Sequence, residues 1–332
     1  MLFKLLILIL LLIYFNIFIF RKNLKINKNV ALCVIAKNEN LYIKEFVEYY
    51  ENLGIKKIYL YDNNDINGEN FSIILNKYIN SDFIKLKNIR GKSEIQILAY
   101  NHCYQSNINR YSWFLFLDVD EFLYIKNNRT LLNFLSDDRF LKCNSIFINY
   151  NEYGDSDLVK YDKRSIFKRF TKSRYGISGK SLTRGGIKKA KIDIHKPLYI
   201  NNYCNSEGES EELFKNKISS SKIVVNDVEI RHFITKSLEE FYQRLIKGWP
   251  CVKKFSKGYY KFVEERIRYY FGLNKITEYK YNKLKPLIFN AIIALSQYTL
   301  KLTISVAVYK VKVTVFITVM PCNIITVNIL SL

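Results

Sequence analysis

The chain is poor in the residues on which several common nucleotide and metal sites depend. Only 12 of its 332 residues are glycine and only 4 are proline, and neither a Gly-x-Gly-x-x-Gly fingerprint nor a Walker-type phosphate loop occurs. A Rossmann dinucleotide-binding fold and a P-loop nucleotidase therefore lose their main sequence support. The six cysteines form no Cys-x-x-Cys pair and no zinc-like spacing. This spacing indicates neither disulfides nor a cysteine nucleophile.

Acidic residues are also scarce relative to basic ones, and the formal net charge is +22. A strongly basic chain can bind nucleic acid through clustered lysine and arginine. Here the basic residues are scattered through a sequence rich in Lys, Asn, Ile and Tyr, which indicates a compositional bias. We expect no specific nucleic-acid partner, whereas general attraction to polyanions or anionic membranes stays open.

The first 20 residues are almost entirely apolar, apart from Lys4 and Asn16. This run is long enough to cross a bilayer as a helix, and it lacks the small residues of a signal-peptide cleavage site. We predict a single-pass N-terminal transmembrane anchor at residues 1–20, followed by a basic linker at 21–29. The positive charges of the linker favour a cytoplasmic domain, whereas two sequons, at Asn70 and Asn128, would fit a lumenal one.

Strand and helix patterns alternate through the first third of the domain. This order predicts an α/β fold with a mostly parallel central sheet and helices on both faces. The expected strands are Val30 to Ala36, Ile55 to Tyr61, Phe83 to Ile89 and the run that begins at Tyr111; the expected helices are Leu41 to Leu53, Phe71 to Ile79 and Glu94 to Tyr104.

The run from Tyr111 to Ile125, YSWFLFLDVDEFLYI, is the most informative segment of the chain. Its apolar first half is typical of a buried central strand. On an extended chain, residues two apart point to the same side, so Asp118 and Asp120 are expected to converge on one divalent cation. Glu121 is expected to point to the opposite face. The alternative is an acidic turn without a ligand.

Polar residues also follow two other predicted strands. They lie at the carboxyl ends of those strands, where an open α/β sheet binds its ligands. We assign Ala36, Lys37, Glu39 and Asp62 to a nucleotide pocket, together with Gln96 at the start of the third helix. For Asp62, an Asx-turn is an equally good explanation.

A second acidic group follows the predicted strand Ser145 to Tyr150. Its members are Glu152, Asp155 and Asp157, which lie near a turn that contains glycine. Transfer of a group to a hydroxyl needs a carboxylate that accepts the hydroxyl proton, and this segment is the nearest supply of candidate catalytic carboxylates. Solvated loop acids are the alternative.

The segment IRHFITKSLEEFYQRLIKG combines a strand end with a helix start. His232 ends the predicted strand and is a candidate metal ligand or a structural histidine. Ser237 and Glu240 form a capping box. Arg244 and Lys247 on the following helix could neutralise a leaving diphosphate or form a solvated face.

These segments together resemble the GT-A glycosyltransferases, in particular glycosyltransferase family 92 and its family 2-like relatives. The resemblance rests on CVIAKNENLYIKEFVEYYENLGIKKIYLYDNND, QILAYNHCYQ, WFLFLDVDEFL, INYNEYGDSDLVKYDKRSIFKRF and IRHFITKSLEEFYQRLIKG. It implies a GT-A domain over residues 30–285, a nucleotide-sugar donor, a divalent cation that is usually manganese, and inverting transfer to a glycan hydroxyl. The tail at 286–332 lies outside it and carries no predicted function.

The resemblance also implies roles for single residues. Asp118 and Asp120 match the metal-binding pair of the family, His232 matches a histidine with a metal or diphosphate role, and Asp155 matches a recurrent acid. Tyr150 departs from the pattern, because the family often has tryptophan there. Two alternatives remain open: a metal-dependent phosphoryl transferase or nuclease, and a non-catalytic membrane-anchored scaffold.

Overall fold

A computed structural model describes residues 29–210, 219–247, 265–266 and 269–270, together with the strand segments 301–308, 311–319 and 325–331. The chain divides into two compact units. Unit 1 comprises Met1–Asn151 and Tyr175–His232, and unit 2 comprises Glu152–Arg174 and Phe233–Leu332. The division therefore falls inside the predicted 30–285 domain.

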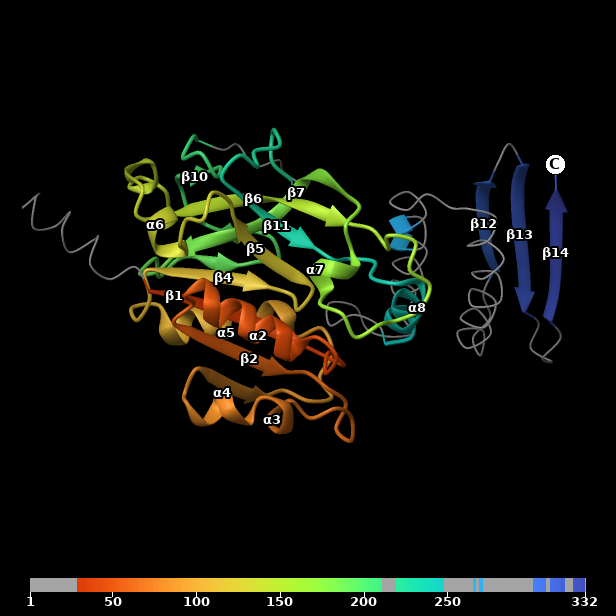
Figure 1. Cartoon of the computed structure of the whole chain (residues 1–332), viewed down its shortest axis with the longest axis horizontal. Helices are drawn as coiled ribbons and strands as arrows, with labels where there is room; N and C mark the ends of the chain where they lie inside the picture. Colours follow the sequence, from red (N-terminus) through yellow and green to blue (C-terminus); the bar gives the residue numbers. More distant parts are fainter. Residues whose placement is uncertain are drawn as a thin grey trace, which may run out of the picture. The chain divides into compact units, whose positions relative to one another are not determined.

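The first part of unit 1 has the predicted alternation of strands and helices (Figure 1). Its first four strands are parallel neighbours in the order β3-β2-β1-β4. Gly54 ends the first helix in the left-handed conformation, with φ of 91°, where a residue without Cβ is favoured. The elements are β1 (Val30–Ala36), α2 (Ile43–Leu53), β2 (Lys57–Asp62), α3 (Phe71–Ile74), α4 (Asn76–Asn80), β3 (Ile84–Asn88), α5 (Gln96–Asn107) and β4 (Trp113–Leu117).

The rest of the sheet is mixed, so the prediction of a mostly parallel sheet was wrong beyond β4. The order continues β4-β7-β6-β11-β5, and both β4–β7 and β11–β5 are antiparallel. No helical crossover follows β4: the chain turns at once into the next strand, which lies at the sheet edge. The elements are β5 (Glu121–Ile125), α6 (Leu131–Leu135), η1 (Asp138–Phe140), β6 (Ser145–Tyr153), β7 (Ser173–Arg184), β8 (Lys191–Ile192), β9 (Pro197–Leu198), β10 (Tyr203–Cys204) and β11 (Val228–His232).

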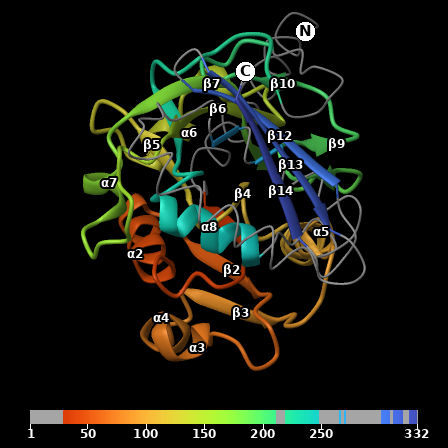
Figure 2. The ribbon, with the colours of Figure 1, turned by 90° about the vertical axis from the view of Figure 1, so that its right-hand side faces the viewer.

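Helices α2 and α5 lie on opposite sides of the parallel strands (Figure 2). On the α5 side, alternate residues of β1, β2 and β4 pack against the helix in one buried cluster. Tyr100 and Tyr104 of α5 are completely buried there, and their rings contact Phe116 and Phe114 respectively. This packing fixes the start of α5 against the end of β4.

Two disulfides join distant parts of unit 1, which corrects the expectation of free cysteines. Cys33 of β1 is bonded to Cys103 of α5, and Cys143 is bonded to Cys204 of β10. Partners separated by 70 and 61 residues leave no short-range spacing pattern to recognise. Closing loops of this length stabilises a fold by about 4 kcal/mol each in the chain-entropy description.

Unit 2 contains helices α7 (Ile166–Arg169) and α8 (Leu238–Lys247) and a three-stranded antiparallel sheet of β12 (Lys301–Val308), β13 (Val311–Val319) and β14 (Ile325–Ser331). The predicted capping box is confirmed, because the Glu240 carboxylate accepts from the Ser237 backbone N–H at 3.1 Å and the Ser237 Oγ accepts from the Glu240 backbone N–H at 3.4 Å. The predicted anchor at 1–20 lies outside the described residues. Among the helices that are described, none is long and apolar enough to span a membrane.

Candidate active site

The first candidate site is the acidic turn, which we define as Asp118, Asp120 and Glu121 between β4 and β5. The backbone N–H of Glu121 donates to the carbonyl of Asp118 at 3.1 Å, which closes a tight turn. The chain is therefore not extended here, and the expectation that both aspartates point to one side was wrong. The turn instead directs the two carboxylates to different partners.

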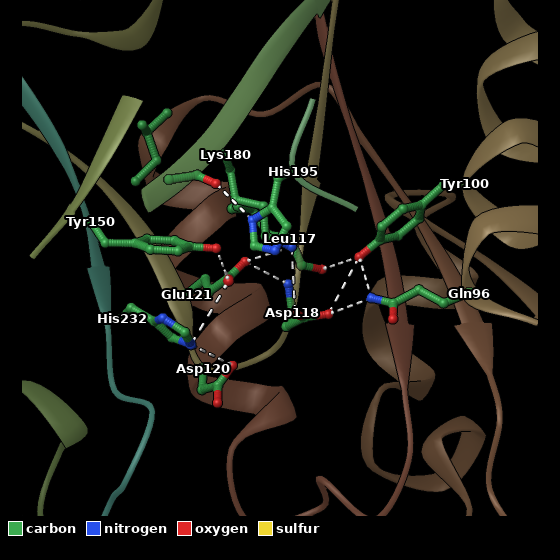
Figure 3. A network of polar contacts seen from close by, with 12 residues as sticks. Gln96, Tyr100, Leu117, Asp118, Asp120, Glu121, Tyr150, Lys180, His195 and His232 are labelled. Carbon is green, nitrogen blue, oxygen red and sulfur yellow. Dashed lines mark hydrogen bonds and ion pairs between the residues drawn. The ribbon is translucent and has the colours of Figure 1, made fainter. Parts of the chain in front are cut away.

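Glu121 is the centre of this network, and its predicted orientation to the opposite face was also wrong (Figure 3). Its carboxylate is 1% exposed and accepts hydrogen bonds from the Tyr150 hydroxyl at 2.7 Å and from the backbone N–H of Asp118 at 3.0 Å. Burial raises the pKa of Glu121 to about 8, although Lys180 opposes the rise. Burial and this carboxylate raise the pKa of Tyr150 far above its usual range, so its hydroxyl remains a donor.

Asp118 is held by donors from two other elements. Its Oδ1 accepts from Gln96 Nε2 at 3.0 Å and from the Tyr100 hydroxyl at 3.4 Å, both on α5. Its Oδ2 lies 3.4 Å from Nζ of Lys180 on β7. Burial would lower the pKa of Lys180, but Asp118 and Glu121 outweigh it and the pKa is raised. The lysine is therefore a buried cation.

Asp120 faces His232, the last residue of β11. Its Oδ1 lies 3.9 Å from His232 Nε2, and both side chains are at least nine-tenths buried. A carboxylate and an imidazole are a ligand pair that suits manganese and related ions. The pair fits a divalent cation whose other ligands are water and phosphate oxygens. Within the described residues, no three Asp, Glu, His or Cys side chains form a metal site by themselves, so the predicted set with Asp118 is not brought together.

His195 lies beside the same network. Its Nδ1 is 2.9 Å from the carbonyl oxygen of Gly179, and a carbonyl can only accept, so Nδ1 carries the proton. Burial, followed by the charge of Lys180, lowers the pKa of His195 to about 4. This ring is therefore neutral at physiological pH.

The predicted nucleotide-pocket residues lie at the ends of β1 and β2, except for Gln96, which contacts Asp118 instead. Ala36 is buried at the end of β1, and the Glu39 carbonyl accepts the first hydrogen bonds of α2. Asp62 adopts the alternative Asx-turn: its Oδ1 accepts from the Asn64 backbone at 2.9 Å and its Oδ2 pairs with Arg90 at 3.2 Å. Lys37 forms an ion pair with Asp65 at 2.7 Å.

The second candidate group belongs to unit 2, and we call its members Glu152, Asp155 and Asp157 the acidic loop. Asp155 is 2% exposed, and its carboxylate accepts from the Tyr270 hydroxyl at 2.5 Å and from the Asp157 backbone at 2.9 Å. Asp157 is half-exposed and pairs with Lys172. Glu152 pairs with Arg174 at 3.4 Å. Each acid therefore has a basic or hydroxyl partner of its own.

The two predicted diphosphate contacts lie on α8. The guanidinium of Arg244 donates to the Ile234 carbonyl at 3.3 Å. This side chain also lines a small pocket in unit 2, together with Thr235 and Arg266. Lys247 is the last residue of the helix, and its side chain lies outside the described residues.

Comparison with known proteins decides the family. The family model of Glycosyltransferase family 92 matches residues 28–281, which is most of the chain. The chain belongs to glycosyltransferase family 92. The predicted membership of family 92 is therefore confirmed.

Two relatives of this family 92 protein are distant in sequence. A family 92 protein of Oryza sativa subsp. japonica is 22% identical over 43% of this chain, and one of Ricinus communis is 24% identical over 31%. The aligned regions span about a quarter or less of these relatives, 24% and 18%. Among solved structures, S. aureus TarS 1–349 in complex with UDP-GlcNAc aligns with 81% of each chain at 13% identity and a TM-score of 0.39.

Lys180 was not predicted from the sequence of this family 92 protein. Its strand reads SRYGISGKSLTR, which is too polar to be recognised as buried. The signal that could have found it is a lysine directly after Gly179. A Cβ on Gly179 would lie 2.0 Å from the carbonyl oxygen of Ile148, so β6 and β7 approach closely at this point. Such an approach indicates that the next side chain enters the interior.

Proposed function

We propose that this enzyme transfers a sugar from a nucleotide-sugar donor to a hydroxyl of a glycan acceptor, with inversion and with Mn²⁺ or Mg²⁺ as cofactor. Family membership supports the transfer of a sugar. The observation that carries the finer proposal is the acidic turn at the carboxyl end of β4. There Asp120 and His232 are within 3.9 Å of each other while their neighbours are held by other donors.

In this proposal Asp120 and His232 hold the cation. When bound, the ion acts as a Lewis acid on the leaving diphosphate. Glu121 orients the turn through its bonds to Tyr150 and the Asp118 backbone. Fixed polar groups of this kind need little reorganisation during the reaction, which is the main advantage of a preorganised site.

The donor nucleotide is proposed to occupy the edge where β1, β2 and β4 end. These strands are parallel neighbours, so their carboxyl ends meet at one edge. Ala36, Lys37, Glu39 and Asp62 would shape the nucleotide pocket, Gln96 would act through Asp118, and Arg244 and Lys247 would offer positive charge to the diphosphate.

The acceptor side needs a base. We propose that one carboxylate of the acidic loop, Glu152, Asp155 or Asp157, takes the proton from the attacking hydroxyl as the new glycosidic bond forms and the nucleoside diphosphate leaves. General base catalysis of this kind contributes roughly 10²–10⁴ in rate.

The decisive test is Asp120→Asn in the purified full chain. We expect it to abolish Mn²⁺-dependent hydrolysis of UDP- or GDP-sugars while leaving the thermal unfolding profile nearly unchanged, because the amide is isosteric but a poor cation ligand. Asp82→Asn is the matched control, since Asp82 is an exposed acid of the same unit that pairs with Lys57. Full activity of Asp120→Asn would contradict the proposal that Asp120 holds the catalytic cation. Tight, salt-sensitive binding of DNA or RNA would favour a nuclease instead.

We propose further that residues 1–20 anchor the protein in a membrane and that the domain faces an oxidising compartment. The disulfides Cys33–Cys103 and Cys143–Cys204 support this orientation, because such bonds persist mainly outside the cytosol. The sequon residues Asn70 and Asn128 are exposed.

The orientation is tested by expressing the full chain in eukaryotic cells and treating it with an N-glycosidase. We expect a mobility shift that disappears in the double variant Asn70→Gln, Asn128→Gln. An unmodified chain with reactive thiols at all six cysteines would place the domain in the cytoplasm.

A further inference from the structure

Lys180 is a lysine in direct contact with two carboxylates of the acidic turn. It lies on β7 and is 1% exposed. Its Nζ is 3.4 Å from Asp118 Oδ2 and 3.4 Å from Glu121 Oε2. An ammonium group at such depth is stable only when carboxylates compensate it. The burial of the Lys180 ammonium group therefore depends on its contacts with Asp118 and Glu121.

The position of the ammonium is fixed by the surrounding backbone. Gly179 allows β6 to approach within a distance that a side chain would block, and the Gly179 carbonyl is bonded to His195. The backbone that precedes Lys180 is therefore fixed both by β6 and by His195. Figure 3 shows it entering the network opposite Asp120.

The two aspartates of the turn consequently have different surroundings. Asp118 uses one oxygen for Gln96 and Tyr100 and the other for Lys180. Asp120 instead faces the imidazole of His232, whose Nε2 also lies 3.8 Å from Glu121 Oε1. A protein cation therefore lies on one side of the turn, and a pair of metal-ligand groups lies on the other.

We infer that Lys180 is a built-in cation that occupies one of two cation positions at the acidic turn and restricts the site to a single divalent ion on Asp120 and His232. The inference deepens the proposed function and rests on it for the divalent ion. Enzymes with two metal ions hold them about 3.5–4 Å apart between shared carboxylates. Here an ammonium group lies on the carboxylates that a second ion would share, which favours glycosyl transfer over two-metal phosphoryl transfer. Lys180 is thus a positioning residue.

The test measures Mn²⁺ binding to the purified full chain by electron paramagnetic resonance and calorimetry. The wild type is expected to bind one ion. Lys180→Met is expected to bind a second ion or to bind the first at least about tenfold more tightly, because a nearby positive charge has been removed. Lys180→Arg keeps the charge and is expected to bind one ion. Lys191→Met, on the exposed face of β8, is the control for the change in net charge.

Equal affinity and stoichiometry for the wild type, Lys180→Met and Lys191→Met would overturn the inference. If Lys180→Met does not fold, a second comparison tests the inference. Asp120→Asn should weaken Mn²⁺ binding at least about ten times more than Asp118→Asn, because the Asp118 carboxylate contacts Lys180 and not the ion. Equal losses would overturn the inference.

Failure of the proposed function gives a different result. In one outcome, the wild type binds no Mn²⁺ while Lys180→Met binds it. That result would support the inference that Lys180 occupies a cation position, and it would contradict the proposal that the enzyme uses a divalent cofactor. If the wild type binds Mn²⁺ and transfers sugar while Lys180→Met binds it unchanged, the proposed function is supported and the inference about Lys180 is overturned.

Discussion

The acidic turn of unit 1 and the acidic loop of unit 2 contain the same kind of side chain but hold it in opposite ways. In the turn, Asp118 and Glu121 share a buried lysine, and donors reach them from α5, β6 and β7. In the loop, each acid has a different side-chain partner, and Asp157 is half-exposed. The turn is one connected network, whereas the loop is a set of separate pairs.

This difference predicts different responses to substitution. In a connected buried network, removing one member leaves others without compensation, so stability and geometry change together. Separate pairs can be removed one at a time, with exposed pairs contributing least. Activity and stability should therefore be separable in the loop but linked at Asp118 and Glu121 of the turn, which share Lys180.

The largest expected effect concerns the protonation of Glu121. Its pKa is about 8 in the folded chain against 4.5 for the free side chain. The folded state therefore binds the proton more tightly, and the stability that this provides is fully present below about pH 4.5 and is lost as pH rises through 8. In chelator-treated protein, we expect the free energy of unfolding to fall by up to about 5 kcal/mol across this range because of Glu121.

The measurement is urea unfolding of the wild type and Glu121→Gln at several pH values. The difference between their unfolding free energies should shift steadily in favour of the glutamine variant as the pH rises. Glu51→Gln, an exposed substitution on α2, should show no such trend. A pH-independent difference for Glu121→Gln would show that the turn does not couple its charges as described.

A smaller effect is expected within the acidic loop. Asp155→Ala removes the acceptor of the Tyr270 hydroxyl and of the Asp157 backbone, and leaving buried donors unsatisfied costs about 1–3 kcal/mol. Asp157→Ala removes only a half-exposed ion pair with Lys172 and should change stability less. Chemical denaturation of both variants measures this difference.

Sugar-transfer rates of the same two variants, with Glu152→Ala, identify the base. One of the three should lose at least about a hundredfold in kcat without an equal loss of folded protein. If all three keep their rates, the acidic loop does not supply the base. If Asp157→Ala proves the more destabilising of the pair, the description of the loop as separate pairs is wrong.

Much of the parallel half of the sheet was predictable from the sequence. β1 begins and ends at the predicted residues, and α2 ends at the predicted residue, Leu53. The capping box of Ser237 and Glu240 was also predictable. These features depend on residues close in sequence, where hydrophobic periodicity and capping preferences act directly.

The mixed half of the sheet was less predictable, because it depends on an irregular turn at Asp118. Strand periodicity assumes that the chain stays extended through Asp118. The turn at that residue changes the direction of three side chains together and sends β5 to the sheet edge. No feature of the apolar run before it marks where the extended conformation ends.

The sequence by itself determined the class of fold, the family and the presence of carboxylates at the end of β4, because each depends on the order and chemical type of the residues. Only the tertiary structure decided how those carboxylates are used. Lys180, Tyr150 and His232 reach the turn from strands far along the chain, and the disulfide partners are 61 and 70 residues apart. Such contacts arise from the pairing and packing of strands, and no local pattern of residues specifies them.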